Sequence, residues 1–216
     1  MISNKELVNY LKELTVDTGF INKLKIVYRP YVCPFGPLLG FIEDDDVVLD
    51  IGCGSGQFGL LAAKFANPKA IYGIEIDENL IYNANQIFNS QNFDIHFSFE
   101  VFNGKDFPKN LALSDIIFLI DVLHHVPLNI RVDFFKNIVS AMKPGARIVL
   151  KDINAGSPLV LANKVHDLVF AKEIGNEISF NDAIKLLKDL DLKIEDAVKT
   201  TTYVYPHYTI VAKKES

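Results

Sequence analysis

The chain has 216 residues, of which 49% are hydrophobic and 23% are charged, a balance typical of soluble globular proteins. This length favours one structural domain, and the apolar content is high enough to build a core, which excludes wholesale disorder. The formal net charge is −5 and the isoelectric point is near 5.5, so the broad basic surface of a non-specific nucleic-acid binder is absent.

Cysteine and histidine spacing argues against disulfide or metal scaffolds. Cys33 and Cys53 form no CxxC pair, and the five histidines show neither HxxxH nor HxH spacing, so we expect no metal site. The N-terminus alternates charged and apolar residues, unlike a signal peptide. The longest apolar run, near residues 116–120, is far shorter than the roughly 20 residues that span a bilayer. We therefore expect a cytoplasmic protein without stable membrane insertion.

The N-terminal part predicts helices and turns. Ser3 and Glu6 have the spacing of a capping box and predict a helix of about twelve residues. Residues 15–39 contain several prolines and glycines and predict short helical pieces and turns. The acidic run at residues 43–46 predicts a solvated turn before the first strand. We treat residues 1–45 as an N-terminal helical cap.

From residue 47 onward, apolar strand-like runs alternate with segments of helical period. The predicted strands are 47–51, 70–76, 95–102, 114–120, 146–153, 192–202 and 203–212, and the predicted helices are 58–65, 79–89, 128–142, 157–170 and 181–190. Such alternation predicts an α/β fold, a doubly wound and mostly parallel seven-stranded sheet. The last two strands are joined by very few residues, which predicts an antiparallel C-terminal hairpin. Residues 46–216 would then form one Rossmann-like domain.

The segment VVLDIGCGSGQFG, residues 47–59, is the most informative motif. A predicted buried strand extends to Asp50. After it come Gly52, Gly54 and Gly56, and then a predicted helix begins. Glycines there permit tight backbone turns and let a ligand approach the main chain closely, and a helix N-terminus favours an anionic group. Glu75 ends the next strand, where an acid can accept hydrogen bonds from ribose hydroxyls. The same loop also fits the GxGxxG dinucleotide fingerprint, which keeps a nicotinamide-dependent oxidoreductase open as an alternative.

Asp50, two residues before the first glycine of the GxGxG core, resembles the first motif of class I S-adenosylmethionine-dependent methyltransferases. The segments NGKDFP (103–108), SDIIFLIDVLHHVP (114–127) and MKPGARIVLKDI (142–153) resemble later motifs of that family in the same order. The resemblance covers about residues 46–153 and implies S-adenosylmethionine as the cofactor.

The resemblance also implies which residues hold the cofactor. The loop, with Asp50, Gly52, Cys53, Gly54 and Gly56, would hold the methionine part. Glu75 and Ile76 would meet the ribose and its surroundings. Asn103 and Gly104 stand where the family often places an acid near the adenine, and the Asn is a departure from that pattern. Asp121, after the fourth strand, and Tyr31, in an aromatic segment before the first strand, complete the expected cofactor contacts.

Three histidines are candidates for a general base. His124 and His125 follow the fourth strand, at the sheet edge where parallel strands end, and we favour His125 slightly. Asp121 could orient one of them. His166 lies on the predicted helix 157–170 and is a further candidate. Each of these histidines could instead serve only in packing or capping.

The motifs that the chain lacks exclude several classes of substrate. The chain lacks both the Asn/Asp-Pro-Pro-Tyr/Phe motif of amino-group nucleic-acid methylases and the Pro-Cys nucleophile of cytosine methylases. We therefore expect a small-molecule acceptor and no nucleic acid, with O-methylation favoured because a histidine base suits hydroxyl deprotonation. A cofactor-binding regulatory protein without turnover is an alternative, and a homodimer is left open.

Overall fold

The computed structural model describes residues 2–14, 27–157, 176–203 and 205–215. By its internal contacts the chain divides into two units, Met1–Asp106 and Phe107–Ser216. The predicted helix 157–170 and His166 lie outside the described residues. No described helix combines the length and the apolar composition needed to cross a membrane.

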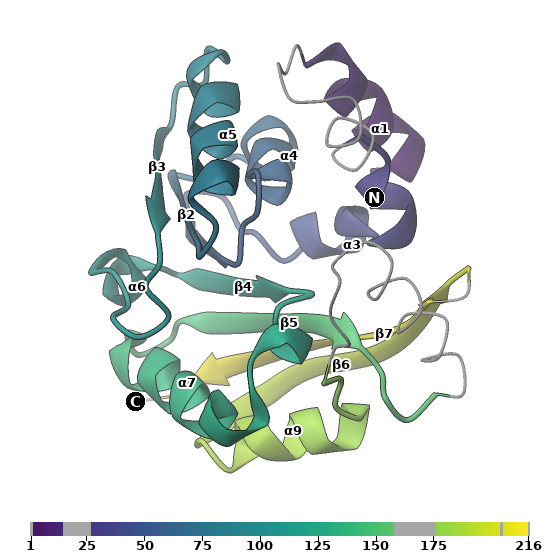
Figure 1. The fold of residues 1–216 in the computed structure, drawn as a ribbon, viewed down its shortest axis with the longest axis vertical. Coiled ribbons are helices and arrows are strands. Elements are labelled where there is room, and N and C mark those ends of the chain that lie inside the picture. The colour runs from purple at the N-terminus through teal and green to yellow at the C-terminus, as the bar shows by residue number, and fades with distance from the viewer. Residues whose placement is uncertain (1, 15–26, 158–175, 204, 216) are drawn as a thin grey trace. The chain divides into compact units, whose positions relative to one another are not determined.

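The first unit contains three parallel strands in the order β3-β2-β1. In Figure 1, α4 and α5 lie next to β2 and β3. Its elements are α1 (Asn4–Glu13), α3 (Phe35–Leu39), β1 (Val47–Ile51), α4 (Gln57–Phe65), β2 (Ala70–Glu75), α5 (Glu78–Asn89) and β3 (His96–Val101). Residues 27–32 are also helical. The predicted capping box is confirmed, because Glu6 N donates to Ser3 Oγ and Ser3 N donates to Glu6 Oε2.

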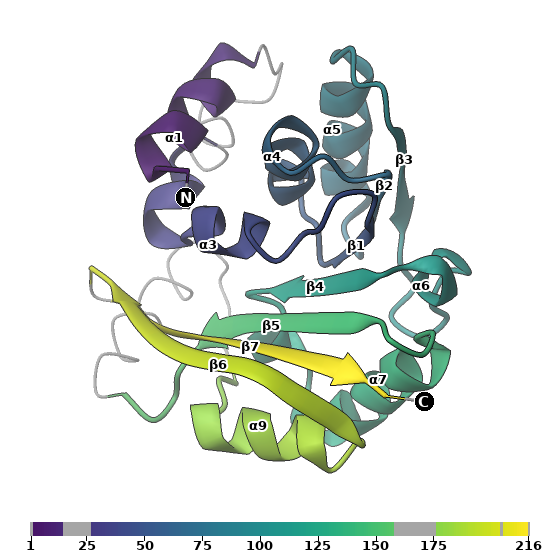
Figure 2. The same ribbon diagram turned by 180° about the vertical axis from the view of Figure 1, so that it is seen from behind.

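The second unit contains four strands in the order β4-β5-β7-β6 (Figure 2). Its elements are α6 (Asn110–Leu113), β4 (Ile116–Ile120), the 3₁₀ turn η1 (Leu123–His125), α7 (Leu128–Ala141), β5 (Arg147–Ile153), α9 (Phe180–Lys188), β6 (Leu192–Thr202) and β7 (Tyr205–Lys214). β4 and β5 are parallel, whereas β7 runs antiparallel to both β5 and β6. The predicted hairpin is therefore confirmed, with its second strand beginning two residues later than expected.

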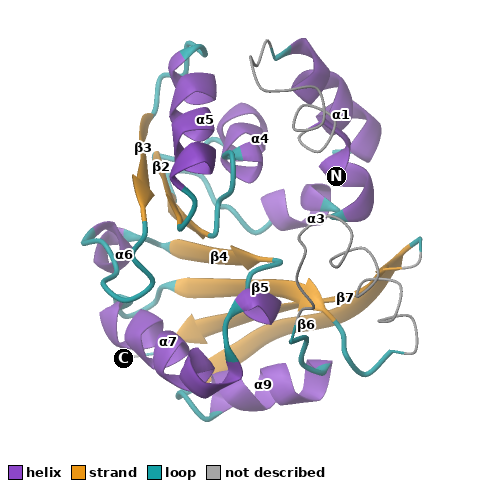
Figure 3. Ribbon diagram, viewed as in Figure 1, coloured by secondary structure: helices purple, strands orange, loops and turns teal. Residues whose placement is uncertain are grey.

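The burial of each strand follows its place in the sheet. All five residues of β4 are buried, as its unbroken apolar sequence predicts. β6 is the outer strand of the second unit, most of its residues are exposed or half-buried, and its register shifts between Ile194 and Asp196. The alternation of strands and helices is visible in Figure 3. The predicted fold class, a mostly parallel seven-stranded α/β sheet with an antiparallel C-terminal hairpin, is confirmed.

Gly73 in β2 creates the space into which the glycine loop packs. A Cβ atom built on Gly73 would lie 2.4 Å from Cδ1 of Phe99 and 2.8 Å from Sγ of Cys53. These distances are shorter than real contacts, so any side chain at this position would displace the neighbouring strand or the loop.

We expect Gly73→Ala to lower the free energy of unfolding by about 1–3 kcal/mol, because overpacking a closed site forces its neighbours to move. Gly40→Ala is the matched control. Its φ of −69° suits alanine, and the nearest atom to the added Cβ would be the Pro37 carbonyl oxygen at 3.3 Å. Urea unfolding of both variants checks this, and an equal loss of stability in the two would contradict the explanation.

Candidate functional site

The glycine loop of the first unit folds back onto the end of β2. Gly52, Gly54 and Gly56 have φ values of +76°, +55° and +76°, a region that residues with side chains rarely adopt. The amides of Gly52 and Cys53 both donate to the carbonyl oxygen of Ile74, at 2.7 Å and 3.1 Å. The positive φ angles thus turn the chain tightly enough for the loop to be held by the neighbouring strand.

Glu75 connects the loop to the start of α5. One of its carboxylate oxygens accepts from Gly54 N at 3.1 Å, and the other accepts from Ile76 N at 2.7 Å and Asp77 N at 3.2 Å. Each oxygen of a carboxylate can accept more than one hydrogen bond, so the expected bonds from ribose hydroxyls remain chemically available.

The amides of Gly52, Cys53 and Gly54 therefore donate hydrogen bonds to acceptors within the protein. The family resemblance implied that this loop would hold the methionine part of the cofactor. In the structure, the start of α4 is the better candidate for that contact, because Gly56 precedes it and no side chain caps it. The positive end of a helix dipole favours a carboxylate or another anionic group.

Asp50 places a buried and incompletely bonded carboxylate beside this loop. The side chain is only 3% exposed, and its Oδ1 finds no hydrogen-bond partner among the described residues. Burial raises the pKa of Asp50 to about 7, against the lowering effect of Arg29. A buried acceptor without a donor fits a ligand that brings a positive donor group, such as the ammonium of the methionine part of S-adenosylmethionine.

Cys53 is a packing residue of the loop. Burial raises the pKa of its thiol well above the ordinary value, and Asp50 and Glu75 add to the effect. A thiol in such surroundings is a poor nucleophile. Its side chain fills the space that Gly73 leaves in β2.

The remaining predicted cofactor residues of the first unit differ in their availability. The side chain of Ile76 is 71% exposed directly after Glu75, as expected of an apolar group that could cover a nucleoside. Asn103 instead uses its side chain within its own turn, accepting from the amides of Lys105 and Asp106. Gly104 is exposed in that turn with a φ of +80°. Tyr31 stacks on Tyr28, with ring centroids 6.4 Å apart.

Taken together, the loop, Asp50, Glu75 and Ile76 fit the amino-acid and ribose ends of S-adenosylmethionine. The fit rests on the unsatisfied oxygen of Asp50 and the uncapped start of α4. The assignment of Asn103 has less support, because its amide group is already engaged.

In the second unit, η1 carries the two candidate histidines. His124 is 4% exposed, and its Nδ1 lies 2.6 Å from Oδ1 of Asp152 at the end of β5. The amide of His124 also donates to Oδ2 of Asp152. His125 is exposed, and its ring centroid lies 4.0 Å from that of His124.

A buried ion pair lies at the ends of β4 and β5. Lys151 is 1% exposed, and its Nζ lies 2.6 Å from Oδ1 of Asp121. Asp121 has a φ of +57°, an uncommon conformation for a residue other than glycine. Strained conformations of this kind persist where the surroundings over-determine them, and they cluster at functional sites.

Asp152 and Lys151 were not identified from the sequence as site residues. A signal for both was present, because a lysine and an aspartate stand inside the otherwise apolar strand RIVLKDI. Charged residues in a buried strand need partners, and here the partners are Asp121 and His124.

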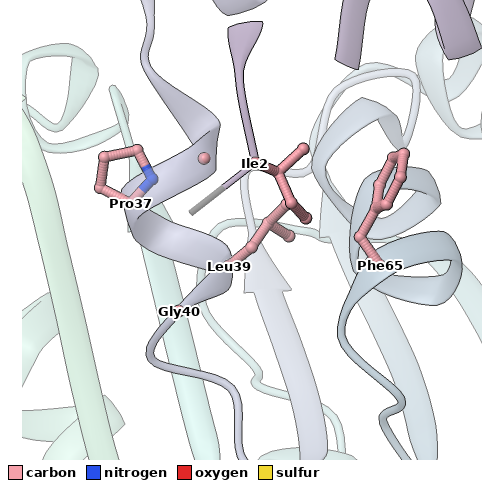
Figure 4. A pocket seen from close by; sticks show the side chains of 6 residues that line it. Ile2, Pro37, Leu39, Gly40 and Phe65 are labelled. Atoms are coloured by element: carbon pink, nitrogen blue, oxygen red, sulfur yellow. The ribbon is translucent and has the colours of Figure 1, made fainter. Parts of the chain in front are cut away.

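The first unit also has a hollow away from the glycine loop. It has a volume of about 320 Å³ and is lined by Ile2, Gly36, Pro37, Leu39, Gly40 and Phe65 (Figure 4). None of the predicted site residues lines it, and its side chains offer no polar group to orient a ligand. Within the described ranges, no cluster of histidine, cysteine and acidic side chains could hold a metal ion.

The raised pKa of Asp50 has a consequence for stability. In an unfolded chain an aspartate titrates near pH 4, roughly three units below the folded value. The folded state therefore binds this proton more tightly, so Asp50 lowers stability progressively as the pH rises from about 4 to about 7.

We expect Asp50→Asn to gain in melting temperature relative to the parent over this range. Thermal unfolding at pH 5 and pH 8 checks this, with exposed Asp94→Asn as the control. A difference between Asp50→Asn and the parent that does not change with pH would contradict it.

Comparison with known proteins identifies the family of this chain. A methyltransferase domain family matches residues 42–201. A 27-O-demethylrifamycin SV methyltransferase from Amycolatopsis mediterranei is 28% identical over 173 residues, covering 78% of this chain and 62% of the relative. A ribosomal protein L11 methyltransferase from a Psychrobacter species is 27% identical over 129 residues, covering 60% of this chain and 39% of the relative. The chain thus spans less than two thirds of the length of these curated relatives.

A solved structure supports the fold. The crystal structure of a S-adenosylmethionine-dependent methyltransferase from Methanosarcina mazei superposes with a TM-score of 0.68 at 22% identity, covering 83% of this chain and 97% of that one. Because the family match extends over most of the residues, including the glycine loop, Glu75 and the histidine turn, the chain belongs to this methyltransferase domain family.

Proposed function

We propose that this protein transfers a methyl group from S-adenosylmethionine to a hydroxyl oxygen of a small-molecule acceptor. The observation that carries the proposal is the buried pair of His124 and Asp152, at the turn that follows β4. A hydroxyl is a weak nucleophile until its proton is removed, and a histidine held by a carboxylate is suited to remove it.

The donor supplies an electrophilic methyl group, so the protein has to bind and orient both molecules and receive one proton. In this proposal Asp152 is ionised and can only accept hydrogen bonds, so His124 carries its proton on Nδ1. Nε2 is then left as the basic nitrogen of the ring. The orientation resembles the way a buried aspartate holds a histidine in hydrolase triads.

His124 and His125 differ in exposure and in hydrogen bonding, and both properties bear on which of them acts as the base. His125, which the sequence slightly favoured, is exposed. His124 has the bound carboxylate and a fixed ring. We propose that His124 takes the proton and that His125 lies against it at the surface.

Charge and similarity support a small-molecule acceptor. The net charge of −5 is unfavourable for an extended nucleic-acid partner. The relative from Amycolatopsis mediterranei acts, by its name, on an O-demethylated rifamycin. The relative from Psychrobacter is named for a ribosomal protein, so protein acceptors belong in the test as the competing class.

Ligand binding tests the first part of the proposal. At one hundred times their dissociation constants, S-adenosylmethionine and S-adenosylhomocysteine should each add about 2.7 kcal/mol to the stability. We expect thermal shifts with both and none with NAD. Glu75→Ala should reduce the shifts, because the loop loses the acceptor of Gly54 N. A shift with NAD alone would overturn the assignment of the cofactor.

Turnover tests the second part. We expect His124→Asn and Asp152→Asn to lower kcat by about 10²- to 10⁴-fold, the usual contribution of a general base. The dissociation constant of S-adenosylhomocysteine should stay nearly constant in both variants, because it reports cofactor binding and not proton transfer. Transfer of a labelled methyl group to panels of hydroxylated compounds, amines and proteins gives the readout.

His125→Asn is the matched control for turnover. A larger loss in His125→Asn than in His124→Asn would move the base to His125. Labelling confined to amines or proteins would refute the hydroxyl acceptor.

A further inference from the structure

Arg131 on α7 is a buried cation at a position suited to an apolar side chain. It lies on the same helix face as Phe135 and Ile138, which are both fully buried, and it is itself only 4% exposed. Burying a guanidinium is unfavourable unless its charge and its donors are compensated. The acceptors and charges that surround the guanidinium therefore indicate the role of Arg131.

The guanidinium holds the turn that carries the histidines. Its Nη2 donates to the carbonyl oxygens of Leu123 and Val126, both at 3.0 Å, and to that of Asn176 at 2.7 Å. Leu123 begins η1 and Val126 follows it, so one nitrogen binds both ends of the turn. In return, the amide of Asn176 donates to the carbonyl oxygen of His124 at 2.8 Å.

The charge of Arg131 is not neutralised by direct contact with a carboxylate within the parts of the chain that the structure describes. Its Nε and Nη1 are buried and find no hydrogen-bond partner there. Burial lowers the pKa of Arg131, and the negative charge of Asp152 opposes this lowering. Arg131 and Asp152 therefore interact through space, while Asp152 is bonded to His124.

Among the described residues, other charged and titratable groups lie on the elements next to Asp152 and η1. They include Asp121 after β4, His125 on η1, Lys151 on β5, and His207 and Tyr208 on β7. Lys151 is paired with Asp121, and Arg131 on α7 interacts electrostatically with Asp152.

We propose that Arg131 is a positioning residue, which fixes the His124 turn through its carbonyls and balances the charge of Asp152 so that His124 stays neutral. The inference rests on the proposed role of His124 as the base. It adds a residue that touches neither donor nor acceptor and acts through Asp152 and the backbone of η1.

The direction of the effect follows from the charges. A carboxylate beside a histidine favours the imidazolium, whereas a cation near that carboxylate disfavours it. If Arg131 is removed, Asp152 draws a proton onto His124. The imidazole then charges at a higher pH, and less of the basic form is present near neutrality.

The test compares Arg131→Met, which removes the charge, with Arg131→Lys, which keeps the charge but lacks the planar guanidinium. The titration of His124 is followed by NMR of the ¹⁵N-labelled imidazole in the full chain, without donor or acceptor. We expect the midpoint in Arg131→Met to rise by about one pH unit. In Arg131→Lys we expect the midpoint to stay near that of the parent while the melting temperature falls.

Lys136→Met is the matched control, since it removes a positive charge from the exposed face of the same helix. Its midpoint should equal that of the parent. An unchanged midpoint in Arg131→Met, or an equal rise in all three variants, would overturn the proposal. Should Arg131→Met fail to fold, Arg131→Gln replaces it, since it also removes the charge but keeps a donor.

This experiment separates the inference from the proposed function. The titration shift is measured on the protein alone and tests Arg131. The turnover of His124→Asn tests the base. Normal turnover in His124→Asn would remove the proposed base without changing what the titration reports about Arg131.

Discussion

The cofactor site of the first unit depends on the parallel register of β1 and β2. This register places Asp50 opposite Gly73 and Ile51 opposite Ile74. The loop that follows Ile51 therefore meets the last residues of β2, where the carbonyl of Ile74 and the carboxylate of Glu75 hold its amides. A shift of one residue would reverse which side chains face the loop. The absence of a side chain at Gly73 is part of the same constraint, because Cys53 packs there.

The features that could be predicted from the sequence are those whose information is local. The capping box of α1, the glycine loop, the buried strand β4 and the closing hairpin each depend on residues that lie close together in the chain. Glu75 could be predicted because it stands at the end of a strand-like run. Within the described residues, the limits of the predicted elements differed from those of the structure by only a few residues, which reflects how gradually helices and strands end.

The polar contacts of the second unit could not be predicted in this way. The bond between His124 and Asp152 joins residues 28 positions apart, and that between Lys151 and Asp121 joins residues 30 apart. Such pairings depend on which strands become neighbours, which periodicity does not specify. The use of the loop amides was missed for a related reason, since a glycine motif shows that the backbone turns but not what its amides bind. Arg131 was missed because helical periodicity assigns its face to apolar residues.

The exposed outer strand β6 has a consequence for association between molecules. An unpaired strand edge offers its backbone groups to any passing strand, and proteins commonly discourage such pairing with charges and irregular register. β6 has both devices, with exposed or half-buried Lys193, Glu195, Asp196 and Lys199 and a bulge between Ile194 and Asp196. Another copy adding to this edge would have to dehydrate these charges across a kinked strand. Within the described residues β6 pairs with β7 alone, and these features protect its outer edge against the strand pairing that leads to aggregates.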